Sequence, residues 1–302
     1  MNKQWFKHLC QPTIPAPLLI IIIVIMTMQS SKAADFHVEQ VGKGPAVILI
    51  PGLMSDDRVW QSTVDALKHR YEFHLISIAG FAGTPAVSAP SLTRVKDQLL
   101  DYIEQQQLIR PAIIGHSLGG FLSFWLASNA PDKIGPIISV DGLPFIGPIF
   151  TQNHRTSVAD LKPQAEQIKQ MYSNLLPQQL ILQAQSSLSI QAKQTHHRQQ
   201  ILEMAGTSDP KTVGEAMHTL MTTDLRNDLS AIKQPVLLLG ASGAFSLPEQ
   251  HQHAKTLYQQ QLTGLHNATV IMNSKARHFI MFDDPDWLTA SIQSFLTDSI
   301  KE

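Results

Sequence analysis

The chain has 302 residues, of which 43% are hydrophobic and 16% are charged, and its formal net charge at pH 7 is -1. These values are typical of a globular enzyme and exclude a disordered chain, and the balanced charge gives no basis for binding nucleic acid or an acidic membrane. The length suits one large α/β domain with an insertion, or two small domains.

The first 33 residues differ from the rest. Lys3 and Lys7 precede an apolar core at 18–26, and small residues follow it. This order is typical of a secretory signal peptide, which we expect to span residues 1–33 and to be cleaved after Ala33. The alternative is an uncleaved membrane anchor at residues 14–28, although the apolar core is shorter than the ~20 residues of a spanning helix.

Cleavage would change both the charge and the cysteine content. It removes three lysines and no acid, so the net charge would become -1 - 3 = -4. It also removes Cys10, the only cysteine, which lies before the apolar core and is therefore not placed for lipid attachment. An exported chain without cysteine needs no disulfide, which favours a periplasmic or secreted protein.

Apolar patterns predict the first strands and helices. Residues 36–41 alternate, as in an edge strand, whereas 46–50 form a continuous apolar run that predicts a strand buried on both faces of a parallel sheet. Apolar spacing then predicts a helix at 59–69, a strand at 73–78 and a helix at 92–107.

A Gly-x-Ser-x-Gly motif at Gly115, Ser117 and Gly119 follows an apolar strand at 113–114 and precedes a helical pattern. Strand, sharp turn and helix form the context in which this motif presents a nucleophilic serine at the edge of a sheet. A side chain at either glycine would collide with backbone, and the start of the helix faces the point where negative charge develops. We predict that Ser117 is a nucleophile; the alternative is a tight glycine turn without chemistry.

With this motif in this setting, the chain from about residue 36 onward resembles the α/β-hydrolase fold superfamily, in its large group of serine esterases, lipases and lactonases. The resemblance is weakest at 148–230. It implies a mostly parallel, doubly wound sheet with a core at 34–147 and 231–302 and an inserted helical cap at 148–230.

Later patterns fit this division. Strands at 137–140, 236–239 and 268–272 and helices at 249–261 and 287–296 suit the core, and helix-like pieces at 161–175 and 210–221 suit the cap. The methionines of the cap suit either the lining of a site or ordinary core packing; they are Met171, Met204, Met217 and Met221. Phe81 lies in a loop near the expected site and is predicted either to contact a substrate or to pack locally.

The resemblance also implies an oxyanion hole. Relatives carry a His-Gly or similar pair after the strand that corresponds to 46–50, and Pro51-Gly52 stands in that place here. By resemblance, the backbone N–H groups of Leu53 and Leu118 hold the oxyanion, and the departure from His-Gly matters little because the donor is a backbone group. The alternative is an ordinary turn that ends a strand.

The resemblance implies His278 as the catalytic base, because it lies in a loop just after the last strand. A serine is a weak nucleophile until a histidine takes its proton. We expect His116, beside the serine, to be structural. The pairs at 196–197 and at 251 and 253 do not share a helix face, so we predict no metal site.

The carboxylate partner of this base departs from the usual pattern. Its usual place is the loop after strand 236–239, but residues 241–246 contain no acid. The fold has a second place for the acid, at the end of the strand that follows the nucleophile helix, and Asp141 occupies it. The resemblance therefore favours Asp141, with Glu249, Asp224, Asp228 or no acid as alternatives. An Asp-Gly pair such as 141–142 is also a common turn.

These observations predict a serine hydrolase that cleaves a small or medium ester or lactone through an acyl-enzyme on Ser117, with His278 as base. A peptidase or amidase with the same residues and a non-catalytic binding protein of the same fold are the alternatives. We expect a small-molecule acyl substrate, no cofactor, no nucleic-acid partner and no stable membrane insertion after cleavage of the leader. The sequence indicates no oligomeric state.

Overall fold

The computed structural model describes residues 34–299. The predicted signal peptide, the alternative anchor and Cys10 lie outside these residues, so export and the cleavage site stay predictions. Among the helices of residues 34–299, none combines the length and the apolar character needed to cross a bilayer.

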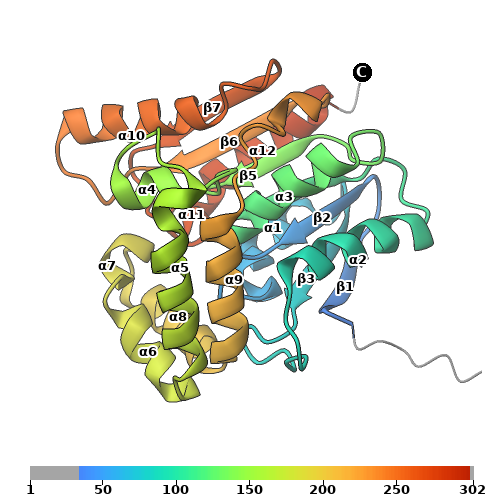
Figure 1. Ribbon diagram of the computed structural model, residues 1–302. Coiled ribbons are helices and arrows are strands. Elements are labelled where there is room, and N and C mark those ends of the chain that lie inside the picture. Colours follow the sequence, from blue (N-terminus) through green and yellow to red (C-terminus); the bar gives the residue numbers. More distant parts are fainter. Residues whose placement is uncertain (1–33, 300–302) are drawn as a thin grey trace, which may run out of the picture. The chain divides into compact units, whose positions relative to one another are not determined.

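Seven strands of the described residues form one sheet in the order β1-β3-β2-β4-β5-β6-β7 (Figure 1). In this sheet β1 pairs antiparallel with β3 at one edge, and all other neighbours are parallel. The predicted mostly parallel, doubly wound sheet is confirmed. The strands are β1 (Phe36–Gly42), β2 (Ala46–Ile50), β3 (Glu72–Ile78), β4 (Ala112–His116), β5 (Ile137–Val140), β6 (Val236–Ala241) and β7 (Ala268–Asn273).

Helices cover both faces of the sheet because the central strands are apolar on both sides. Ile48 and Ile50 of β2 pack in one core cluster with α2 (Leu92–Gln105) and α3 (Leu118–Asn129). Val47 and Leu49 of the same strand pack in a second cluster with α1 (Gln61–Leu67) and α12 (Pro285–Ser299). All four side chains are fully buried, as a continuous apolar run in a parallel sheet requires.

The remaining core helices follow the predicted positions closely. The helix predicted at 59–69 begins as a short 3₁₀ helix, η1 (Asp57–Trp60), before it continues as α1. The helix predicted at 249–261 is α10 (Pro248–Gln261), and the short α11 (Ile280–Asp283) precedes α12.

The insertion between β5 and β6 contains six helices between residues 147 and 222, joined by short loops. Its helices are α4 (Gly147–Thr151), α5 (Val158–Ser173), α6 (Pro177–Gln185), α7 (Leu188–Gln191), α8 (Thr195–Gly206) and α9 (Pro210–Thr222), and the short η2 (Leu229–Ala231) follows them. The helix α5 packs along α9, and α6 packs against α8 (Figure 1). The pieces predicted at 161–175 and 210–221 correspond to α5 and α9, whereas the sequence analysis did not predict α6, α7 and α8.

Backbone hydrogen bonds tie this insertion to the core. The N–H of Gly83 donates to the carbonyl of Thr207 over 3.0 Å, and the N–H of Asp209 donates to the carbonyl of Gly80 over 2.7 Å. These two bonds hold the loop after β3 to the segment that joins α8 to α9.

The junction of β4 and α3 leaves no room for a side chain at two glycines. A Cβ atom on Gly115 would lie 2.0 Å from the carbonyl oxygen of Gly119, and one on Gly119 would lie 2.2 Å from the carbonyl oxygen of Ile50. Both obstacles are backbone atoms, which cannot turn away as a flexible side chain can. This close approach explains why both positions of the Gly-x-Ser-x-Gly motif are glycine.

We expect Gly115→Ala to lower the free energy of unfolding by more than about 3 kcal/mol, because the new methyl group overlaps backbone in a close-packed junction. Urea unfolding measures the change. Gly264→Ala is the matched control, since the atoms nearest to its Cβ would lie at 3.4 Å or beyond, and it should change stability by less than about 1 kcal/mol. Equal effects of the two substitutions would contradict the steric explanation.

Candidate active site

Ser117 has a strained backbone conformation between β4 and α3. Its φ of 53° and ψ of -113° lie outside the regions that L-residues ordinarily occupy. The N–H of Ser117 donates to the carbonyl of Val140 over 2.9 Å, and the carbonyl of Ser117 accepts from the N–H of Phe121 over 3.0 Å. These bonds fix the serine at the carboxyl end of the sheet, where open α/β sheets bind their ligands.

His278 and Asp141 are joined directly. Nδ1 of His278 donates to Oδ2 of Asp141 over 2.6 Å. Asp141 follows the last residue of β5 with a φ of 51°, in the left-handed region that aspartate enters more readily than most residues. Its other oxygen, Oδ1, accepts from the N–H of Ala241 and from the hydroxyl of Tyr258, each over 2.7 Å. The N–H of Ala241 and the hydroxyl of Tyr258 therefore hold this carboxylate against the histidine ring.

Tyr258 is a residue of this network that the sequence did not reveal. It is buried on α10, and burial, followed by the charge of Asp141 and the hydrogen bond to it, raises the pKa of its hydroxyl well above 10.0. The phenol therefore stays protonated and keeps donating to Asp141. Nothing in a Gln-rich helix marks one tyrosine for this contact, because the contact depends on how α10 packs beside the end of β5.

The insertion contacts the His278 loop through its main chain. The N–H of His278 donates to the carbonyl of Ile190 over 3.2 Å, and the N–H of Phe279 donates to the carbonyl of Gln191 over 2.9 Å. Both carbonyls belong to α7. Helix α7 of the insertion thus holds the backbone of His278, and Asp141 holds its ring.

His116 binds the loop that carries His278, which agrees with the structural role expected of it. Its ring is fully buried, and Nε2 donates to the backbone carbonyl of His278 over 3.1 Å. Burial, reinforced by the neighbouring His278, lowers the pKa of His116 well below 6.5. A neutral imidazole with its proton on Nε2 satisfies this geometry, because an imidazolium ring could not be solvated there.

Ser117 and His278 both line two neighbouring cavities. The larger has a volume of about 450 Å³, and the smaller a volume of about 150 Å³. No hydrogen bond joins the two side chains among the described residues, and such catalytic bonds commonly tighten only when substrate binds. The larger cavity is mainly apolar, with Leu118, Phe121, Leu143, Ile146, Ile149, Ile190, Leu220 and Phe245 in its walls.

The two predicted oxyanion donors lie one in each cavity. Leu53 lines the smaller cavity and Leu118 the larger, and Ser117 lines both. Within residues 34–299, neither backbone N–H has a hydrogen-bond acceptor. Two free N–H groups beside a serine are the arrangement that can hold a developing alkoxide.

The alternative acids lie elsewhere. Glu249 lines a neighbouring cavity of about 370 Å³ at the start of α10. Asp224 pairs with Arg226 over 2.6 Å, and Asp228 is exposed. Of these candidates, Asp141 alone forms a hydrogen bond with His278 in the described part of the chain.

Phe81 and the methionines of the insertion were each predicted either to line the site or to pack in the core, and the structure favours packing. Phe81 is fully buried in the core. None of Met171, Met204, Met217 and Met221 lines either cavity at Ser117, and Met204 and Met221 are core residues. The apolar walls of the larger cavity come instead from branched and aromatic residues of α3, α4, α7, α9 and the loops.

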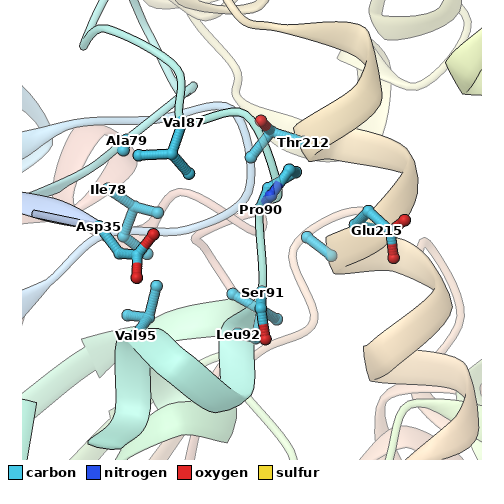
Figure 2. Close-up of a pocket in the computed structure, with 11 residues that line it drawn as sticks. Asp35, Ile78, Ala79, Val87, Pro90, Ser91, Leu92, Val95, Thr212 and Glu215 are labelled. Atoms are coloured by element: carbon cyan, nitrogen blue, oxygen red, sulfur yellow. The ribbon is translucent and has the colours of Figure 1, made fainter. Parts of the chain in front are cut away.

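A separate depression lies between α9, the start of α2 and the residue before β1 (Figure 2). Asp35 and Glu215 line it, but its volume of about 10 Å³ leaves room for a water molecule at most. Asp35 is already bound by Arg94 and Gln98, each over 2.8 Å. Among residues 34–299 no group of three or more His, Cys, Asp or Glu side chains is arranged to hold a metal ion.

The family model described as "Alpha/beta hydrolase family" matches residues 47–290. The chain belongs to the alpha/beta hydrolase family. The predicted fold family is therefore confirmed, and so is the prediction of a serine hydrolase enzyme.

Curated relatives of this alpha/beta hydrolase include two pimeloyl-[acyl-carrier protein] methyl ester esterases. The protein from Nitrosomonas europaea is 27% identical over 206 residues, which cover 68% of this chain and 80% of that protein. The protein from Nitrosospira multiformis is 25% identical over 266 residues, which cover 86% and 98%.

Solved structures show the same fold at lower identity. An esterase from Thermogutta terrifontis superposes with a TM-score of 0.71 at 16% identity, over 87% of this chain and 93% of that one. The enol-lactonase from Burkholderia xenovorans gives a TM-score of 0.68 at 17% identity, over 87% and 96%.

We expect Asp141→Asn to slow the reaction of the protein with a fluorophosphonate about 10³- to 10⁴-fold, because an amide can neither fix the histidine tautomer nor stabilise imidazolium. The rate of covalent labelling measures this. Glu249→Gln is the matched control and should react at the wild-type rate. A slow Glu249→Gln beside a fast Asp141→Asn would assign the acid to α10.

Because His116 is buried and its pKa is lowered, we expect the free energy of unfolding to fall on mild acidification. Its folded-state pKa lies below that of the unfolded chain, near 6.5, so its contribution is complete above pH 6.5 and is lost as pH falls towards the folded value. From pH 6.5 to about pH 5.5, we expect the wild-type folding equilibrium constant to fall up to about fivefold more than that of His116→Phe. Urea unfolding at the two values measures this.

The control for this experiment is His266→Phe, which removes an exposed histidine. Its pH dependence should match that of the wild type. If His116→Phe also matched the wild type, the buried neutral histidine would not be the source of the effect.

Proposed function

We propose that this alpha/beta hydrolase cleaves a carboxylic ester or lactone through an acyl-enzyme on Ser117, with His278 as base and Asp141 as its carboxylate partner. The observation that carries the proposal is the Asp141–His278 hydrogen bond of 2.6 Å beside a serine at a strained strand-to-helix turn. A carboxylate, an imidazole and a hydroxyl in this order are the parts that acyl transfer needs.

In the first step, Oγ of Ser117 attacks the carbonyl carbon while Nε2 of His278 takes the hydroxyl proton. The tetrahedral intermediate then expels the alcohol, which receives that proton from His278. In the second step a water molecule attacks the acyl carbon, again with His278 as base, and the acid leaves with Ser117 restored. Asp141 stabilises the imidazolium form in both steps and is not itself protonated.

The oxyanion of each intermediate is assigned to the N–H groups of Leu53 and Leu118. Their lack of any other acceptor within residues 34–299 supports this assignment. Loss of one such donor typically costs about 10²- to 10³-fold in rate, so the pair accounts for several kcal/mol of transition-state stabilisation.

The sizes of the two cavities favour an ester whose acyl group is larger than its alcohol. The cavity of about 450 Å³ is large enough for a small or medium acyl chain, and the cavity of about 150 Å³ suits a short alcohol. The names of the esterase relatives, which describe methyl esters of an acyl chain, agree with this division. We therefore propose methyl and other short-alcohol esters as substrates.

We expect the purified protein to hydrolyse methyl hexanoate and to be labelled by a fluorophosphonate, and we expect Ser117→Ala to lose both activities. Ester turnover is followed by release of acid, and labelling by mass spectrometry. Ser128→Ala removes a serine of α3, the helix that follows Ser117, and should retain both activities. A folded wild type that neither hydrolyses the ester nor reacts with the probe would favour a non-catalytic binding protein, and turnover of amides in place of esters would favour an amidase.

A further inference from the structure

Two arginines converge on one backbone carbonyl beside the His278 loop. Nη1 of Arg277 donates to the carbonyl oxygen of Ala192 over 3.1 Å, and Nε of Arg198 donates to the same oxygen over 2.8 Å. Two positively charged guanidinium groups therefore approach a single acceptor. Two positive charges that share one acceptor repel each other, and a nearby anion would relieve the repulsion.

Among residues 34–299, neither guanidinium has a carboxylate partner. The ion pairs of residues 34–299 include neither arginine. Asp283 is close along the chain, but its two oxygens accept the backbone N–H groups of Lys193 and Arg277, each over 2.8 Å. The buried Nε of Arg277 also lacks an acceptor within the described residues. Arg277 therefore carries a positive charge that no acidic side chain neutralises directly.

Arg277 also lines the larger cavity at Ser117. Apart from His278, it is the only basic residue among those that line this cavity, and Asp141 is the only acidic one. Asp141 is occupied by its three donors. The walls are otherwise mainly apolar, and a low-dielectric wall strengthens the attraction between a cation and an incoming anion.

We propose that this site takes esters that carry a free carboxylate, and that Arg277 binds this carboxylate in the larger cavity while Arg198 adds positive potential behind it. A guanidinium group matches a carboxylate in shape and can donate two parallel hydrogen bonds to it. Of the nitrogens of Arg277, only Nη1 donates to the carbonyl of Ala192. This proposal rests on the ester hydrolysis proposed above and adds the chemical class of the substrate: monoesters of dicarboxylic acids.

A structural role is the competing explanation for Arg277. Ala192 is the C-cap residue of α7, and arginines often bind the last carbonyl groups of a helix. If that were its whole role, a substitution at Arg277 would affect the hydrolysis of acidic and neutral esters equally. The decisive quantity is therefore the ratio of kcat/KM for two esters of equal length, one with and one without the distal carboxylate.

The experiment compares monomethyl adipate with methyl hexanoate, and likewise the succinate–butanoate and suberate–octanoate pairs. We expect the wild type to prefer the acidic ester for at least one chain length. Arg277→Gln should lower this acidic-to-neutral ratio by about 10- to 100-fold, the range for loss of a charge-assisted hydrogen bond. Arg277→Lys, which keeps the charge without the paired donors, should retain part of the preference.

Lys193→Gln is the control for a general change of charge. It removes an exposed positive charge from the residue after Ala192 and should leave the ratio unchanged. A wild type that prefers neutral esters at every length, or an unchanged ratio in Arg277→Gln, would overturn the carboxylate proposal. The proposed function would still stand in that case, provided that methyl hexanoate is hydrolysed by the wild type and not by Ser117→Ala.

If neither ester were hydrolysed, the proposed function would fail, and calorimetric titration with adipate and hexanoate would still test the carboxylate site. Preferential binding of adipate that Arg277→Gln weakens would support it. Equal binding of the two ligands, or no binding of adipate, would overturn it.

Discussion

The carboxylate of Asp141 is the point on which the geometry of the candidate site depends. Its oxygens accept from the end of β6, from Tyr258 of α10 and from His278 in the loop after β7, so one side chain connects three segments distant in sequence. A carboxylate with this little exposure needs several donors to remain charged. The same hydrogen bonds that satisfy the charge also fix the histidine. The orientation of His278 and the stabilisation of the Asp141 carboxylate therefore depend on the same hydrogen bonds.

Unfavourable backbone conformations occur at both ends of this arrangement. Ser117 and Asp141 have positive φ values, and each follows the last residue of a buried parallel strand. The N–H of Ser117 donates to the carbonyl of Val140, and the N–H of Asp141 donates to the carbonyl of Leu239, so bonds between adjacent strands hold both turns. The sheet thus offsets the strain by continuing its hydrogen-bond pattern one residue beyond the strand ends. This is why the two side chains project from the sheet edge and do not continue into the core.

The sequence predicted those parts of the molecule that depend on local pattern. The apolar run at 46–50 indicated a buried strand, and the glycines at 115 and 119 indicated a turn that only a missing Cβ allows, as the packing of the β4–α3 junction explains. The partner of His278 could not be fixed, because Asp141 is 137 residues away in the chain and the contact depends on strand order. Helices α6 to α8 were missed because their polar, Gln-rich sequences lack a clear apolar stripe. Tyr258 and Arg277 carry no local signal for their contacts.

Helix α7 of the insertion helps to hold His278 in place. Main-chain hydrogen bonds from His278 and Phe279 reach Ile190 and Gln191 of α7, and the same two residues of α7 line the larger cavity. A shift of α7 would therefore change the shape of the cavity and the support of the base together. The two arginines on the carbonyl of Ala192 join the end of α7 to α8 and to the His278 loop. An anion bound by Arg277 would contact a segment that both lines the larger cavity and supports His278, so recognition of the distal group and alignment of the proposed catalytic histidine would depend on the same few hydrogen bonds.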